Sequence, residues 1–145
     1  MPDGTREGEV RAHFRSQAEA CRLLGSPFTG LVCDLMAARL DVSSRFGQRI
    51  LGWDGDARAD ALALRAAGAF NALARSGDDT ALSALYPPEP AEGEALWAGL
   101  VAAIAAHDAF LTGYLDSAPQ TNEVKRCAAL LGGALGLLLG ADARL

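Results

Sequence analysis

Apolar side chains recur every three or four residues along most of the chain, which is the spacing of one face of an α-helix. The first repeat lies in residues 7–24 and includes Val10, Phe14, Ala18, Cys21 and Leu24. We find no stretch with the clean two-residue alternation of a half-buried strand. Similar repeats predict further helices over residues 27–40, 43–51, 56–77, 80–85, 94–115 and 117–140.

Turn-forming residues separate these stretches. Residues 25–27 (GSP) combine a glycine of the kind that ends a helix, a serine cap and a proline suited to the next helix's first turn. Residues 52–56 (GWDGD) predict a turn, and Asp56 is a suitable cap for the helix that follows. The pattern predicts an all-α fold over residues 1–145. We expect a single orthogonal bundle of about six or seven helices, with an apolar last helix at its centre.

The composition supports this fold class and narrows the function. The chain contains 30 Ala and 22 Leu, which are strong helix formers, against only 7 Val and Ile. Its 13 basic and 18 acidic residues leave a net charge of −5, without the basic surface that nucleic-acid binding requires. We therefore expect neither a nucleic-acid nor a membrane-surface partner.

The three cysteines, Cys21, Cys33 and Cys127, lack metal-site spacing and lie in apolar helical stretches. We interpret them as reduced core thiols of a cytoplasmic protein. Residues 127–141 contain no charge, but 15 residues fall short of the roughly 20 that a membrane span requires, so a buried helix is expected there.

Few residues are candidates for chemistry. His107 lies on an apolar helix face, where it is either a histidine at the edge of the core or a buried base or ligand. His13 lies on the flank of its helix and is predicted to face solvent or an interface. No metal site is expected, because the two histidines lie on separate helices without cysteine or carboxylate ligands at suitable spacing. No nucleophile or phosphate-loop motif is present in the sequence.

The start of the last predicted helix is rich in hydrogen-bonding side chains. Free N–H groups at a helix N-terminus can hold a ligand oxygen, and polar side chains four residues apart share a face. These residues either form a ligand site or an interdomain cleft, or simply cap a buried helix. They are Gln120, Thr121, Asn122, Glu123 and Arg126.

Farther along the same helix, Gly132, Gly136 and Gly140 recur every four residues. Three glycines within a helix cost roughly 2–3 kcal/mol relative to alanine, so a close-packed partner is expected to offset them. That partner is another helix, a second subunit or polypeptide outside this chain.

Four segments resemble an uncharacterised bacterial family, domain-of-unknown-function family 2332, which has no established activity. They are HFRSQAEACRLLGSPF (13–28), GDARADALALRAAGAFNALARSG (55–77), LSALYP (82–87) and PQTNEVKRCAALLGG (119–133). Members of that family are about twice as long as this chain. Their second half carries a glycine-rich segment similar to the S-adenosylmethionine loop of Rossmann-like methyltransferases. This chain contains no such motif.

The resemblance implies that the chain is the N-terminal helical half of a methyltransferase-like protein, serving as a lid or substrate-recognition domain. On that interpretation it binds no cofactor and has no catalysis of its own, although longer members bind S-adenosylmethionine, and its partner is the C-terminal half. Two alternatives remain. One is a non-enzymatic module that dimerises through its last helix, and the other is a small-molecule binder with His107 in an internal pocket.

Overall fold

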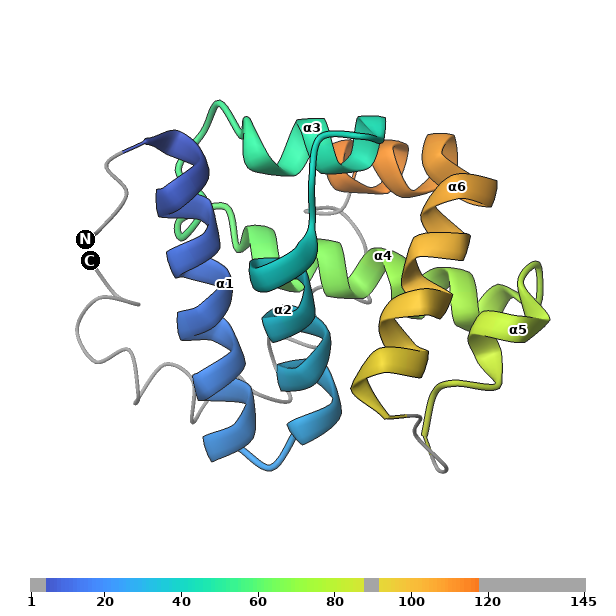
Figure 1. The fold of residues 1–145 in the computed structure, drawn as a ribbon. Helices are drawn as coiled ribbons and strands as arrows, with labels where there is room; N and C mark the ends of the chain where they lie inside the picture. Colours follow the sequence, from blue (N-terminus) through green and yellow to red (C-terminus); the bar gives the residue numbers. More distant parts are fainter. Residues whose placement is uncertain (1–4, 88–91, 118–145) are drawn as a thin grey trace.

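The structure is a computed structural model that describes residues 5–87 and 92–117. These residues contain helices and turns but no strand, so the predicted all-α fold is confirmed. Within them the chain forms six helices (Figure 1). The helices are α1 (Arg6–Leu23), α2 (Pro27–Arg39), α3 (Arg45–Leu51), α4 (Leu62–Ser76), α5 (Thr80–Ser83) and α6 (Gly93–Ser117).

Helices α1 and α2 form an antiparallel pair (Figure 1). Gly25 makes the turn between them in the left-handed region, with φ of +83°, a conformation that glycine adopts without steric cost. The two helices approach closely at Gly30, where an added Cβ would lie 2.9 Å from the carbonyl oxygen of Ala18. An ion pair of 2.6 Å between Arg22 and Asp34 also joins them.

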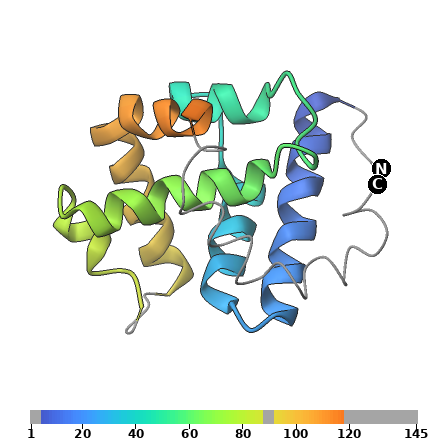
Figure 2. The same cartoon turned by 180° about the vertical axis from the view of Figure 1, so that it is seen from behind.

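Helix α4 runs crosswise behind this pair. Helix α3 lies across one end of the α1–α2 pair, beside the last turns of α6 (Figures 1 and 2). The core lies where these layers meet. Phe46 of α3 contacts Phe70 of α4 edge to face, with ring centroids 5.4 Å apart. The largest fully buried side chains are Phe14, Phe46, Phe70, Met36, Ile50, Leu62, Leu73, Leu82, Leu96, Leu100, Leu111 and Leu115.

Helix α4 begins later than the sequence predicted. Asp56 caps only a single turn, in which its carboxylate accepts the Ala59 N–H at 2.9 Å. That turn ends at Ala61, whose φ of +52° is left-handed, and α4 starts at the next residue. The Leu62 and Ala61 N–H groups bond back to the carbonyls of Ala57 and Arg58 at 2.9 and 3.1 Å, the pattern that commonly ends a helix. The prediction of one continuous helix from Asp56 was therefore wrong.

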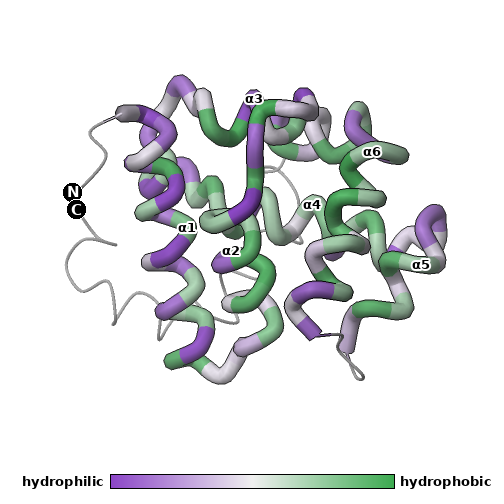
Figure 3. Tube along the Cα trace, viewed as in Figure 1, coloured by the Kyte–Doolittle hydropathy of each residue, from purple (hydrophilic) through white to green (hydrophobic). Residues whose placement is uncertain are grey.

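Helix α6 differs from the other helices in composition. Figure 3 shows it largely apolar, whereas polar and apolar positions alternate along α1. In the described part of the chain α6 is the one helix long and apolar enough to cross a membrane, by length and composition alone. Only 28% of its most apolar window is buried, and Val101 and Phe110 are each 45% exposed. This is weak evidence for a span, because core helices of soluble proteins meet the same criterion.

The cysteines within the described residues are buried thiols. Cys21 and Cys33 are both fully buried and form no disulfide, as predicted. The interaction between the two thiols lowers the pKa of Cys21 and raises that of Cys33, which burial raises as well. Cys127 lies outside the described residues.

Candidate recognition hollows along helix α4

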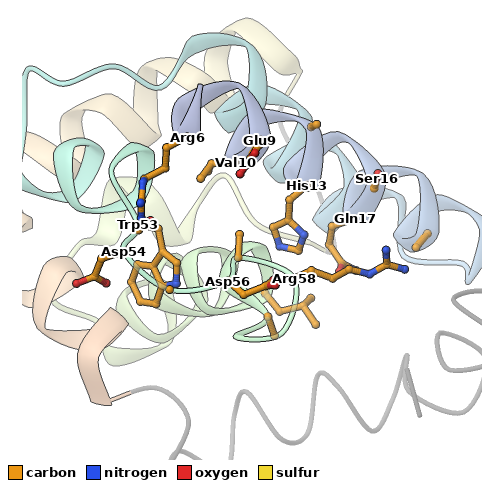
Figure 4. Close-up of a pocket in the computed structure, with 16 residues that line it drawn as sticks. Arg6, Glu9, Val10, His13, Ser16, Gln17, Trp53, Asp54, Asp56 and Arg58 are labelled. Atoms are coloured by element: carbon orange, nitrogen blue, oxygen red, sulfur yellow. Dashed lines mark hydrogen bonds between the residues drawn. The ribbon is translucent and has the colours of Figure 1, made fainter. Parts of the chain in front are cut away.

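Two hollows lie along α4 and share Leu64 in their linings. The first, which we call the His13 hollow, has a volume of about 870 Å³ and lies between α1 and the turn before α4 (Figure 4). The second, the Tyr86 hollow, has a volume of about 580 Å³ and is lined by α2, α4 and residues 83–87. Both fall within the size range of small-molecule sites.

His13 enters the first hollow from α1, and Figure 4 shows its ring directed toward the turn that carries Asp56 and Arg58. Its Nε2 accepts the Ala63 N–H at 3.1 Å, so the imidazole caps the N-terminus of α4 from outside the helix. Because Nε2 is the acceptor, the proton of the neutral ring lies on Nδ1. The sequence predicted that His13 faces solvent or an interface, and the first of these alternatives is wrong, since the residue is half-buried in this capping position.

The surroundings of His13 keep it neutral. Burial, which is the largest cause, and the nearby Arg58 cation together lower its pKa from 6.5 to about 4, although Asp56 opposes the shift. At pH 7 the ring is therefore uncharged, and the nitrogen that could accept a substrate proton already holds the α4 backbone. His13 can donate one hydrogen bond from Nδ1, but it cannot serve as a base at Nε2 without releasing the cap.

Trp53 forms the wall of the His13 hollow nearest α3. Its ring is 5% exposed, and its Nε1–H donates to Asp60 at 2.8 Å. The Arg49 guanidinium lies 4.5 Å from the ring centroid, a cation–π contact. Arg6 donates to the Trp53 carbonyl at 2.6 Å, which ties the start of α1 to the same turn.

Arg65 joins this wall to the end of α6. It donates to the carbonyl oxygens of Asp60 at 2.6 Å and Leu115 at 3.1 Å. Its guanidinium also lies 5.8 Å from the centroid of the Trp53 ring. One side chain therefore fixes the first turn of α4 relative to both Trp53 and the C-terminal end of α6.

The Tyr86 hollow has a different lining. Its walls are mainly apolar, with Val32, Leu64, Ala67 and Ala74 among them. The Phe28 and Tyr86 rings pack with their centroids 4.7 Å apart. The Tyr86 hydroxyl is buried and, among the described residues, has no hydrogen-bond partner. Burial raises the pKa of this phenol well above its usual value, so the hydroxyl is neutral.

His107 does not contribute to either hollow. Its backbone is non-helical, with φ −131° and ψ 30°, and this kinks α6, which the sequence had predicted as a continuous helix. The His107 Nε2 lies 3.3 Å from the Asp79 carboxylate, at the loop before α5. The next residue, Asp108, accepts the N–H groups of Arg45 and Phe46 at 3.0 and 2.9 Å, which caps α3. Consecutive residues at the kink thus hold two different helices.

The other predicted site residues lie outside the part of the chain that the structure describes. They are Gln120, Thr121, Asn122, Glu123 and Arg126 of the polar segment and Gly132, Gly136 and Gly140 of the glycine row. Within residues 5–87 and 92–117, no group of three histidine, cysteine or acidic side chains is arranged to hold a metal ion.

Comparison with models of protein families shows to which family the chain belongs. The model of a family described as an uncharacterized protein conserved in bacteria (DUF2332) matches residues 11–145, which is all but the first ten residues. The chain belongs to this family. No curated protein and no solved structure matches it in the corresponding comparisons.

All of the residues that line the Tyr86 hollow except Thr29 and Val32 come from three of the four segments that carry the resemblance to DUF2332. Ser26 and Phe28 belong to the first segment, Asn71 to the second and Tyr86 to the third. The fold therefore brings together at one hollow residues that lie up to 61 positions apart in the chain, from Ser26 to Pro87. The sequence alone did not single out Tyr86 or this hollow.

Proposed function

We propose that this chain is the helical recognition domain of a longer, methyltransferase-like protein, and that it has no catalysis of its own. Membership of DUF2332 supports the bacterial family but carries no activity. The support for a methyltransferase-like half is the resemblance of longer family members to Rossmann-like methyltransferases. The domain's part in such a protein is to bind and enclose a substrate.

The state of His13 is the observation that favours recognition over catalysis. His13 is the histidine in the larger hollow, yet its Nε2 is engaged by the Ala63 N–H and its pKa is lowered to about 4. A general base at neutral pH needs an open nitrogen and a pKa near 7. The arrangement at His13 stabilises the α4 N-terminus and leaves a single N–H donor for a bound molecule.

Titration with S-adenosylmethionine tests this proposal. Isothermal calorimetry of the 145-residue chain is expected to give no saturable heat, whereas a longer member of the family that contains the glycine-rich segment is expected to bind. The longer protein is the matched control, because it shows that the ligand and the conditions are competent. Micromolar binding by the 145-residue chain would overturn the proposal.

The gene sequence beyond the codon for Leu145 provides a second test. An acidic residue followed by a glycine-rich loop supports the two-part protein, whereas a stop codon at that point contradicts it. This test is independent of whether a purified longer protein happens to be stable.

A further inference from the structure

Two polar side chains of α1 enter the His13 hollow with hydrogen-bonding atoms that the fold does not use. They are His13 and Gln17, one turn apart on the same face of the helix (Figure 4). Gln17 is only 8% exposed, and its amide N–H donates to the Cys21 sulfur at 3.5 Å, a weak acceptor. The Gln17 Oε1 and the His13 Nδ1–H bond to none of the described residues. This face of the hollow therefore offers an unused acceptor next to an unused donor.

Both of these atoms are open to the hollow. In the described part of the chain, the Tyr86 hydroxyl is the one buried side-chain polar atom that is sealed from solvent and also lacks a partner. The Gln17 Oε1 and the His13 Nδ1 lack a partner there too, so they must retain accessible surface. Figure 4 shows both side chains extending from α1 toward the turn before α4. Because buried polar groups are generally hydrogen-bonded, the hollow is where their partners lie.

We propose that the His13 hollow binds a small uncharged molecule through an amide group, as in a carboxamide or a lactam. The amide carbonyl accepts the His13 Nδ1–H, and the amide N–H donates to the Gln17 Oε1. The body of the molecule packs on the apolar part of the lining, which includes Val10, Ala61 and Leu64. This inference rests on the proposed recognition role and names the chemical class that is recognised.

The charged side chains of the lining disfavour an anion. Both guanidinium groups are already used, because Arg6 donates to the Trp53 carbonyl at 2.6 Å and Arg58 has an interaction of its own. Carboxylates outnumber these cations in the lining. They belong to Glu9, Asp54 and Asp56. An anionic ligand would therefore lose its hydration and meet like charges without a free cation.

A cation would satisfy only one of the two open atoms. Ammonium and amidinium groups are donors without an acceptor, so the His13 Nδ1–H would face another donor. The neutral ring cannot move this proton to Nε2, because Nε2 accepts the Ala63 N–H at 3.1 Å. His13 therefore selects a ligand that has an acceptor, and Gln17 selects one that has a donor. A neutral amide has both.

Four compounds of nearly equal size test this class. Benzamide carries a carbonyl and an N–H, acetophenone has a methyl group in place of the amine, benzoate is the anion and benzamidine is the cation. Each is titrated into the ¹⁵N-labelled 145-residue chain and followed by NMR chemical shifts. We expect saturable benzamide shifts centred on Val10, His13 and Gln17. Acetophenone should bind about 3- to 10-fold more weakly, as for the loss of one hydrogen bond, and the two ions more weakly than benzamide.

Gln17→Met removes the acceptor but keeps the length of the side chain. It is expected to weaken benzamide binding about 3- to 10-fold and acetophenone binding less than about twofold, because acetophenone has no N–H to donate. Gln48→Met makes the same substitution at an exposed position on α3 outside the hollow and is expected to leave both affinities unchanged. Circular dichroism of each variant verifies that the helices are retained.

A measurement on the unaltered protein keeps the test valid if Gln17→Met changes the fold. The His13 Nδ1–H is open to exchange with water in the free protein. Bound benzamide should protect this proton, so that its signal appears in ¹H–¹⁵N spectra and shows a nuclear Overhauser contact to the ligand.

Four results would overturn the inference. The first is an absence of saturable shifts at the hollow, and the second is an equal loss of benzamide and acetophenone binding in Gln17→Met. The third is tighter binding of benzoate or benzamidine than of benzamide, which would indicate an ion site. The fourth is a set of nuclear Overhauser contacts in the free protein from the His13 ring to residues 118–145, or to a second copy, which would identify a protein segment as the occupant. None of these results bears on S-adenosylmethionine binding, so this inference and the proposed function fail separately.

Discussion

The two hollows lie next to each other along α4, but their polar side chains differ. Those of the first are hydrogen-bonded within the fold, whereas the Tyr86 hydroxyl of the second bonds to none of the described residues. In the His13 hollow, polar side chains hold the architecture together: His13 caps α4, and the Trp53 indole bonds to Asp60. In the Tyr86 hollow, the walls are mainly apolar and the buried hydroxyl of Tyr86 bonds to none of the described residues. Size alone would favour the first hollow as the binding site, at about 870 against 580 Å³.

This difference in hydrogen bonding determines how substitutions in each hollow should affect stability. A polar side chain that satisfies the backbone or another side chain is required by the fold, and its removal leaves the partner unsatisfied. A buried polar side chain that lacks a partner instead costs the fold its desolvation penalty. Substitutions in the His13 hollow are therefore expected to lower stability, whereas removal of the Tyr86 hydroxyl is not.

The largest effect is expected at Trp53. Trp53→Ala removes a ring that is 5% exposed, together with its bond to Asp60, and should lower the free energy of unfolding by about 4 kcal/mol. Trp53→Phe retains an aromatic ring but not the N–H, and should cost about half as much. Urea denaturation followed by circular dichroism measures both. A loss below 1 kcal/mol for Trp53→Ala would mean that the wall of the hollow is not part of the core.

The next effect is the pH dependence due to His13. Its pKa is lowered to about 4 in the folded protein from an ordinary 6.5, so the unfolded chain binds more protons between these values. Stability from the neutral ring is therefore present above pH 6.5 and is lost as the pH falls toward 4, by up to about 3 kcal/mol at 1.36 kcal/mol per unit.

His13→Gln isolates this contribution from the carboxylates that titrate in the same range. The glutamine carbonyl can accept the Ala63 N–H but does not ionise. The difference in unfolding free energy between wild type and variant should fall steadily from pH 7 to pH 4. Parallel pH profiles for the two proteins would contradict the assignment of His13 as a neutral cap.

A smaller effect, of opposite sign, is expected at Ala61. This residue holds a left-handed conformation with φ of +52°, which costs a residue with a Cβ roughly 1–2 kcal/mol. Ala61→Gly should raise the free energy of unfolding by about 0.5–1 kcal/mol, since glycine's greater entropy in the unfolded chain offsets part of the gain.

Gly77 provides the matched control for Ala61. It has φ of +83° at the end of α4, and an added Cβ would meet no atom within 4 Å, so Gly77→Ala reports the backbone cost alone. It should lower the thermal midpoint by about as much as Ala61→Gly raises it. Thermal denaturation followed by circular dichroism measures both changes, and a loss of stability in Ala61→Gly would contradict the interpretation.

The last effect on stability is expected for Tyr86→Phe, and it is favourable. The variant removes a buried hydroxyl that has no partner among the described residues, together with its desolvation penalty, so the free energy of unfolding should rise, by about 1 kcal/mol. Tyr86→Ala, which also removes the ring packed on Phe28, should cost about 3 kcal/mol. A loss above 1 kcal/mol for Tyr86→Phe would mean that the hydroxyl is already bonded, and the contrast between the hollows would disappear.

The sequence predicted the helices well because their apolar repeats are local. The repeat through Val10, Phe14, Ala18 and Cys21 is buried along α1, and Ser44 caps α3 one residue after the start of the predicted stretch 43–51. The same reasoning failed at residues 57–61, where Asp56 does cap a turn but the chain breaks helical geometry at Ala61. Alanine is a strong helix former, so no composition signal marks that break.

The hollows could not be predicted in the same way, because their residues meet only through tertiary contacts. His13 lies 50 residues from the N–H group that it accepts. A histidine on a helix flank looks solvent-facing until α4 is placed against α1. Tyr86 was recognised only as part of the segment LSALYP, and its lack of a partner is a property of the folded structure. Helix amphipathicity predicts which face is buried but not which polar group lacks a partner.

Arg65 also has a mechanical consequence. It links the Leu115 carbonyl at 3.1 Å to the Asp60 carbonyl at 2.6 Å, and so couples the end of α6 to the turn before α4. Because the Leu115 side chain is itself fully buried in the same core as Phe46 and Phe70, a displacement of the chain there would act on the core packing and, through the Arg65 guanidinium, on the turn before α4. The wall of the His13 hollow and the packing of the bundle are therefore mechanically linked at the end of α6.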